Sequence, residues 1–302
     1  MSVLLAIFAQ DVLPIFLVSG VGFLLARLLR IDVRVVSRVA FNALSPCLVF
    51  TLLMNSRIGA SEFGRLGAFS LSSILGMGLI AWAAAALLRL DRATGTSFVM
   101  VVMFSNTGNF GLSAILLAFG AAALARGTIY FVISSVLMYT LGVFLASSGK
   151  RSARDALRGI ANVPTVYAVA LAVLLLATGL TLPSPVMTGV DLLSSAALPV
   201  MMLVLGMQFE RAGRPDRPRL VALASILTLV VSPLVAFGLA DLTGLTGAAR
   251  QAGVLEASMP AAIMTTVLAL EYDALPSFVT AVVFATTLAS PLTVTLIIAL
   301  LK

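Results

Sequence analysis

One polar stretch, Ser105-Asn106-Thr107-Gly108-Asn109-Phe110-Gly111, interrupts a long apolar segment that runs from about residue 98 to residue 119. Glycine lowers helix stability, and asparagine side chains compete with the helix for backbone hydrogen bonds. In hydrocarbon no water is present to satisfy the backbone groups that a broken helix exposes. Such a break is tolerated only where it faces other protein or a water-filled cavity, as in the interrupted helices of many secondary transporters. A simpler interpretation is that the glycines allow close helix packing and the asparagines hydrogen-bond neighbouring helices.

The composition favours an all-α integral membrane protein. The chain has 302 residues, of which 61% are hydrophobic and only 10% are charged, and apolar runs of membrane-spanning length occur almost from end to end. Histidine is absent, which excludes imidazole bases, histidine metal ligands and histidine proton relays. The net charge is +7, and the basic residues that produce it lie in short loops between the apolar runs. Membrane topology explains such a distribution, so we expect the lipid bilayer and no nucleic acid as a partner. No lysine or arginine precedes Arg27, so a removable signal peptide is not expected.

The apolar runs predict ten transmembrane helices in two halves. Residues 1–148 form a first five-helix repeat, residues 149–161 a cytoplasmic linker, and residues 162–302 a second five-helix repeat. The predicted helices lie at residues 9–29, 36–56, 66–89, 95–120, 125–147, 162–181, 187–207, 219–240, 248–270 and 275–300.

The basic residues predict the orientation of these helices. If the N-terminus lies outside, 14 of the 19 lysines and arginines fall in connections on the inner side and 5 fall in outer connections or ends. Positive charge is retained on the cytoplasmic side of a membrane. The asymmetry therefore predicts a multi-pass protein of a bacterial inner membrane with both termini outside.

An internal repeat relates the two halves. Leu44-Ser45-Pro46 in the second helix corresponds to Ala197-Leu198-Pro199 in the seventh, with 153 residues between the two prolines. The same offset moves Asn106 to Met259, within Ser258-Met259-Pro260-Ala261-Ala262 of the ninth helix. Because five helices are an odd number, the two halves insert with opposite orientation. Paired interrupted helices in an inverted repeat indicate a transporter binding site.

The two interruptions are expected to bind an anion. The second half of the fourth helix should begin near Asn109 or Phe110, and that of the ninth near Pro260, because proline suits the first helical position. Asn109 and Ser258 have the chemistry of N-caps. Two helix N-termini would then point at the middle of the membrane, each with free N–H groups and a partial positive charge. Such a place favours an anion without a resident lysine or arginine.

The motifs at residues 106–111, 258–262 and 44–46 together resemble those of the auxin efflux carrier family of membrane transporters, and the resemblance covers the whole chain. It implies two inverted five-helix repeats with crossed, broken fourth and ninth helices. It also implies transport of small molecules that carry a carboxylate, and a homodimer. Two features depart from the family's pattern: the central connection is short, and Ser113 stands where members often carry proline.

The candidate substrate-binding residues are those at or near the two interruptions, namely Asn106, Thr107, Gly108, Asn109, Ser258, Met259, Pro260 and Ser45. Glu256 is the candidate for proton coupling, because a charge at mid-bilayer costs about 2.5–3.5 kcal/mol. Alternatively, Glu256 pairs with a polar neighbour or lies near the outer interface. Asn42 is expected to bond a neighbouring helix, and Asp11, Asp191 and Asp241 to lie near helix ends.

We therefore predict a secondary transporter, an exporter of small organic anions such as carboxylates that works by alternating access at the crossing of helices four and nine. The alternative is a sodium- or proton-coupled organic-anion symporter of the bile-acid-transporter type. An intramembrane enzyme is disfavoured because neither a serine–lysine nor a paired-aspartate arrangement is evident within the helices. No phosphate-binding loop, selectivity-filter sequence, cofactor site or metal site is predicted.

Overall fold

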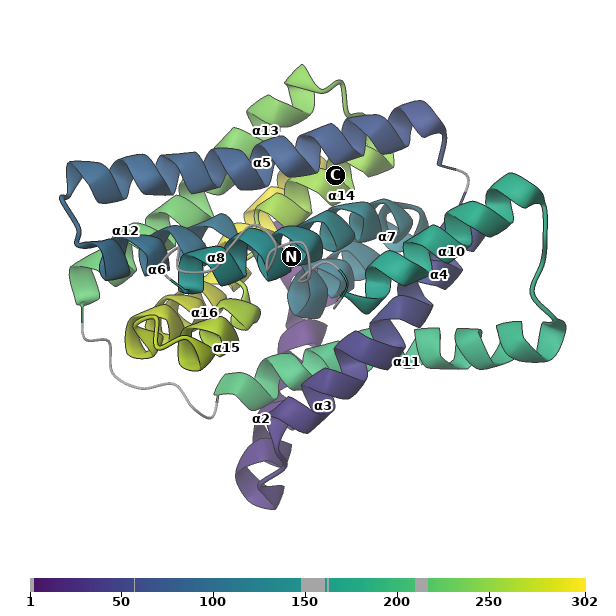
Figure 1. The fold of residues 1–302 in the computed structure, drawn as a ribbon, viewed down its shortest axis with the longest axis horizontal. Coiled ribbons are helices and arrows are strands. Elements are labelled where there is room, and N and C mark those ends of the chain that lie inside the picture. Colours follow the sequence, from purple (N-terminus) through teal and green to yellow (C-terminus); the bar gives the residue numbers. More distant parts are fainter. Residues whose placement is uncertain (1–2, 57, 148–160, 162, 210–216) are drawn as a thin grey trace.

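The computed structural model describes residues 3–56, 58–147, 161, 163–209 and 217–302, which form a bundle of helices (Figure 1). Seven described helical segments are long and apolar enough to cross a membrane, and Pro164–Thr178 is a shorter apolar helix. Large apolar side chains are exposed on the outside of the bundle, among them Leu79, Trp82, Leu234 and Leu292. These features confirm an all-α, multi-pass protein of the lipid bilayer. The count of ten membrane-spanning helices stays a prediction, and the predicted linker lies almost entirely outside the described residues.

The first half of the chain contains helices and single π-helical turns, labelled η. In chain order they are α1 (Val3–Ile7), η1 (Phe8–Val12), α2 (Leu13–Leu29), α3 (Val33–Val39), η2 (Ala40–Leu44), α4 (Ser45–Asn55), α5 (Ala60–Leu87), α6 (Arg92–Met103), η3 (Thr107–Gly111), α7 (Leu112–Leu137), η4 (Met138–Gly142) and α8 (Val143–Ala146). Within α7, Gly120 has φ 78° and ψ −173°, which interrupts the helical path. This glycine lies at the predicted end of the fourth membrane helix.

The second half begins with α10 (Pro164–Thr178) and ends with α16 (Pro276–Leu301). Between them lie α11 (Ser184–Gln208), α12 (Pro218–Ile226), η6 (Leu227–Val231), α13 (Ser232–Leu242), α14 (Gly247–Ala257) and α15 (Ile263–Glu271). Proline occupies the first or second position of α2, α4, α10, α11, α12, α13 and α16. In α10, α11, α12 and α16 the proline lies where a helix begins, and its missing N–H group costs nothing there. In α2, α4 and α13 the proline instead follows a π-helical turn within a continuous helical segment, because it cannot donate the backbone hydrogen bond of a regular turn.

The helices pack in two groups. In the first, α2 and α4 from the first half contact α10 and α11 from the second half, and Figure 1 shows α4, α10 and α11 together on the lower right. In the second, α5, α6 and α7 pack with α12, α13, α14, α15 and α16. The groups meet largely at the turns η1 and η3. The turns η1 and η3 therefore lie where the two groups touch.

The contact between α2 and α11 depends on two glycines. A Cβ atom on Gly206 would overlap the backbone of Ser19, and one on Gly22 would overlap the backbone of Leu203. The Ser19 hydroxyl donates a hydrogen bond of 3.0 Å to the Met202 carbonyl oxygen across the same contact. Small residues let membrane helices approach to backbone contact, and a serine hydroxyl adds a hydrogen bond between them.

We predict that Gly206→Ala lowers the free energy of unfolding by about 1–3 kcal/mol, because the added methyl group can be placed only by separating α2 from α11. The matched control is Gly189→Ala in the same helix, where an added Cβ meets no atom within 4 Å. The control should be neutral or stabilising by up to about 1 kcal/mol, since alanine is the better helix former. Denaturant titration in detergent micelles measures both variants, and equal effects would contradict the close contact.

Candidate functional site

Both predicted helix interruptions are present. Helix α6 ends at Met103 and the chain becomes helical again at Thr107, the first residue of η3. Helix α14 ends at Ala257 and the chain becomes helical again at Ile263, the first residue of α15. Apart from the Ser258 and Met259 amides, which still bond carbonyl oxygens of α14, the intervening residues have backbone groups that no helix of their own satisfies.

The two interruptions satisfy each other. The Asn106 amide donates to the Pro260 carbonyl oxygen at 2.7 Å, and the Ala262 amide donates to the Phe104 carbonyl oxygen at 2.8 Å. Ser105 and Ala261 lie opposite each other as an antiparallel bridge. The Ala261 amide donates to the Thr286 hydroxyl of α16 at 3.2 Å. Segments far apart in the sequence thus replace the water that hydrocarbon cannot supply.

The predicted N-caps were wrong. The Ser258 hydroxyl donates to the Val254 carbonyl oxygen at 2.6 Å, so it belongs to the end of α14 and does not cap α15. Asn109 lies inside the turn η3, which begins two residues earlier than expected. Helix α15 begins at Ile263 and not near Pro260. The physical reason is the pairing of the two interruptions, which keeps residues up to Ala262 extended before the helix can start.

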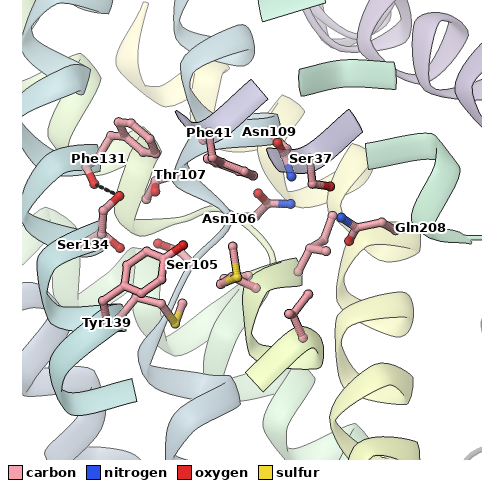
Figure 2. Close-up of a pocket in the computed structure, with 17 residues that line it drawn as sticks. Ser37, Phe41, Ser105, Asn106, Thr107, Asn109, Phe131, Ser134, Tyr139 and Gln208 are labelled. Atoms are coloured by element: carbon pink, nitrogen blue, oxygen red, sulfur yellow. Dashed lines mark hydrogen bonds between the residues drawn. The ribbon is translucent and has the colours of Figure 1, made fainter. Parts of the chain in front are cut away.

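A pocket of about 610 Å³, its open mouth included, lies beside the crossing (Figure 2). Four predicted site residues line it: Asn106, Thr107, Gly108 and Asn109. Among the described residues, no aspartate, glutamate, lysine or arginine lines the pocket. Its other polar side chains are Ser37, Ser105, Ser134, Ser135, Tyr139 and Gln208. The pocket therefore offers amides and hydroxyls, and it holds no fixed charge of either sign.

The remaining predicted site residues do not line this pocket. Ser258 and Met259 are fully buried, and Pro260 contributes its carbonyl oxygen to the crossing. Ser45 is also buried, and its hydroxyl has no hydrogen-bond partner among the described residues. Glu256 is fully buried behind the crossing. The second motif thus supports the site through its backbone, whereas the first motif supplies side chains to the pocket.

Sequence reasoning missed a wall of the pocket that distant helices supply. Ser37 and Phe41 come from α3 and η2, Phe131 and Ser134 from α7, and Gln208 from the end of α11. Figure 2 shows Ser37, Asn106, Asn109 and Gln208 on one side, and Phe131, Ser134 and Tyr139 on the other. The sequence did contain one indication of this wall: Ser37 and Phe41, and likewise Phe131, Ser134 and Ser135, are spaced so that they share one face of a helix.

Two amide atoms at the crossing have no partner among the described residues. Asn106 Nδ2 and Asn109 Oδ1 are both buried, and neither makes a hydrogen bond. A buried polar atom without a partner costs about 1–3 kcal/mol, so these amides favour a ligand that bonds them.

Gly108 brings this backbone close to two rings, since an added Cβ would lie 3.0 Å from Phe131 and 3.3 Å from Phe41.

Comparison with known proteins gives the same family model twice along the chain. The model, described as "Membrane transport protein", matches residues 7–156 and residues 151–298. An uncharacterised transporter of Methanothermobacter thermautotrophicus is 29% identical over 266 residues, which are 86% of each chain. An uncharacterised transporter of Methanocaldococcus jannaschii is 30% identical over 202 residues, which are 66% of each chain.

We predict that Thr286→Val lowers the free energy of unfolding by about 1–3 kcal/mol, because it leaves the buried Ala261 amide without an acceptor. The matched control is Thr287→Val, a residue equally buried whose hydroxyl bonds only the Val283 carbonyl oxygen of its own helix. Denaturant unfolding in detergent should show a clearly smaller loss for the control. A loss at residue 287 as large as that at residue 286 would rule out a specific role for Thr286 at the crossing.

Proposed function

This chain belongs to the auxin efflux carrier family of membrane transport proteins, and we propose that it carries small organic anions through the pocket at Asn106 by alternating access. Its family consists of transporters and not enzymes. The observation that carries the proposal is the crossing of two interrupted helices beside a pocket that has unpartnered amide atoms. Sites of this construction are where secondary transporters bind their substrates.

Helix termini make an anion the favoured substrate. The N-terminal residues of η3 and α15 line the pocket at Thr107, Gly108, Ile263 and Met264. The free N–H groups of a helix N-terminus carry a partial positive charge. Together with the Asn106 amide they attract a carboxylate without holding it as tightly as an arginine would. Weak binding suits a carrier, which has to release its substrate on the other side.

The two groups of helices provide the movement that alternating access needs. Ser37, Phe41 and Gln208 belong to the helices around α2 and α11, whereas residues 105–109 and 262–267 belong to the other group. A substrate in the pocket therefore lies between the groups. We propose that the group containing the crossing shifts against the other in a rocking or elevator-like motion, which opens the pocket to each side in turn.

The same proposal includes ten membrane helices in two inverted repeats. The double match of the family model and the packing of α2 and α4 with α10 and α11 support it. We further propose that the protein lies in the inner membrane as a homodimer, with both termini outside. The distribution of basic residues supports this orientation.

The membrane potential favours export. With the cell interior negative, an anion that moves outward gains about 2.3 kcal/mol per charge for every 100 mV. This free energy corresponds to roughly fifty-fold accumulation outside, without any coupled ion. The alternative is a sodium- or proton-coupled symporter of the bile-acid-transporter type, and the buried carboxyl group of Glu256 favours its proton-coupled form.

We predict that Asn106→Ala and Asn109→Ala each weaken binding of a carboxylate by about 5- to 150-fold, which corresponds to about 1–3 kcal/mol. Lactate, succinate and benzoate are suitable probes, and isothermal titration calorimetry measures their binding to purified protein. The matched control is Asn42→Ala, because the Asn42 amide is exposed and donates only to the Arg38 carbonyl oxygen. Unchanged affinity in both site variants would leave these asparagines with a structural role alone.

Transport current in proteoliposomes tests the direction and the coupling. Under an imposed potential, and with no pH or sodium gradient, an anion carrier should give a current that follows the voltage once a carboxylate is supplied. Protein-free liposomes are the control. Strict dependence on sodium or on a pH gradient would support the symporter, and no response to any of the three carboxylates would contradict both.

A further inference from the structure

Glu256 is a carboxylic acid isolated inside the protein. It lies in the last turn of α14, its side chain is fully buried, and neither carboxyl oxygen has a hydrogen-bond partner among the described residues. Burying an ionised carboxylate without a partner is strongly unfavourable, whereas the neutral acid is tolerated far better. The site is therefore built for a carboxyl group that carries a proton.

Two glycines make room for this carboxyl group. A Cβ atom on Gly111 would overlap Oε2 of Glu256, and one on Gly127 would come within 3.4 Å of Oε1. Gly111 ends the turn η3 and Gly127 lies in α7. The carboxyl group thus occupies a notch between the two elements that follow the first interruption.

Within the part of the chain that the structure describes, the surroundings of Glu256 supply no counter-charge. The elements packed against α14 are α5, α7, α13, α16 and η3, and on them the titratable side chain that faces Glu256 is the phenol of Tyr130. The charged groups of these elements bond elsewhere, in the pairs Arg126–Glu62, Arg250–Asp241 and Lys302–Asp11 and from Arg65 to the Gly244 carbonyl oxygen. A proton is therefore the species available to neutralise Glu256.

Two short connections join this notch to the pocket. The Gly111 amide donates to the Asn106 carbonyl oxygen at 3.0 Å, so the turn that touches Glu256 also holds the pocket asparagine. The buried phenol of Tyr130 lies close enough to Glu256 to be affected by its charge, and the Tyr130 hydroxyl lies 3.5 Å from the Ser73 hydroxyl and near Ser105. Ser105 lines the pocket. Glu256 therefore lies next to elements that also hold residues of the pocket.

We infer that Glu256 binds a proton and that its protonation is linked to the state of the pocket, an inference that rests on the proposed function for the pocket's role as the anion site. Protonated Glu256 fits the notch and does not repel an anion at Asn106. Ionised Glu256 repels that anion and disturbs the packing of η3. By linkage, an anion in the pocket then favours the proton at Glu256 to the same degree.

Infrared difference spectroscopy during a pH titration tests the protonation without any substrate. The purified protein should show the carbonyl stretching band of a buried, protonated carboxylic acid at neutral pH. The band should be absent from Glu256→Gln and retained in Glu271→Gln, which removes an exposed glutamate from α15. If Glu256→Gln does not fold, Glu256→Met serves the same comparison. A band that persists without Glu256, or is missing from the unmodified protein, would overturn the inference.

Thiol labelling tests the link to the pocket, also without a substrate. Cys47 is the one cysteine of the chain, so Ser37→Cys in a Cys47→Ser background places a single thiol in the pocket wall. A water-soluble maleimide labels this thiol, and the labelling rate is measured at each pH in the protein with Glu256 and in the Glu256→Gln variant. The ratio of the two rates is then plotted against pH, because the titration of the thiol itself affects both rates equally and cancels in the ratio. The ratio should change at least about fivefold from acidic to alkaline pH. The same ratio for Glu271→Gln should stay constant.

A constant ratio for Glu256→Gln would overturn the link between proton and pocket. Failure of the proposed function has a different signature: the band and the labelling change would both be present, yet lactate, succinate and benzoate would neither bind nor be transported.

Discussion

The structure depends on the backbone pairing at the crossing, where residues 104–106 and 260–262 exchange hydrogen bonds. Each interruption exposes donors and acceptors that hydrocarbon cannot satisfy. Two interruptions at the same depth satisfy one another, and Thr286 accepts the hydrogen bond of the Ala261 amide. The breaks in α6–α7 and α14–α15 are therefore mutually dependent, and neither would be stable at this depth alone.

The composition of the pocket follows from this constraint. The backbone of the crossing satisfies itself, and among the described residues Asn106 Nδ2 and Asn109 Oδ1 are left without a partner. Small residues are needed on both faces of the first interruption: Gly108 admits the rings of Phe41 and Phe131, and Gly111 admits the carboxyl group of Glu256. One seven-residue stretch thus lies between the pocket that we propose binds an anion and the notch in which we propose that Glu256 binds a proton.

Much of the first motif's role was predictable because it depends on local chemistry. Both breaks occur at their motifs, and Asn106, Thr107, Gly108 and Asn109 line a pocket there, while their binding of a substrate stays a prediction. The N-cap assignments of Asn109 and Ser258 failed, because residues that resemble caps were taken up by the extended pairing and by the end of α14. Local propensity indicated where each helix stops, and pairing between distant segments determined where the next one starts.

The sequence by itself determined that this is a helical membrane protein and where two of its helices break, since hydrophobic runs and the backbone preferences of glycine, asparagine and proline act within a few residues. Only the tertiary structure decided which atoms satisfy the freed groups and which side chains close the pocket. Ser37, Phe131 and Gln208 line the same pocket as Asn106 from three different helices, and Glu256 is buried with no hydrogen-bond partner among the described residues. These properties depend on contacts between segments far apart in the chain, which no local pattern encodes.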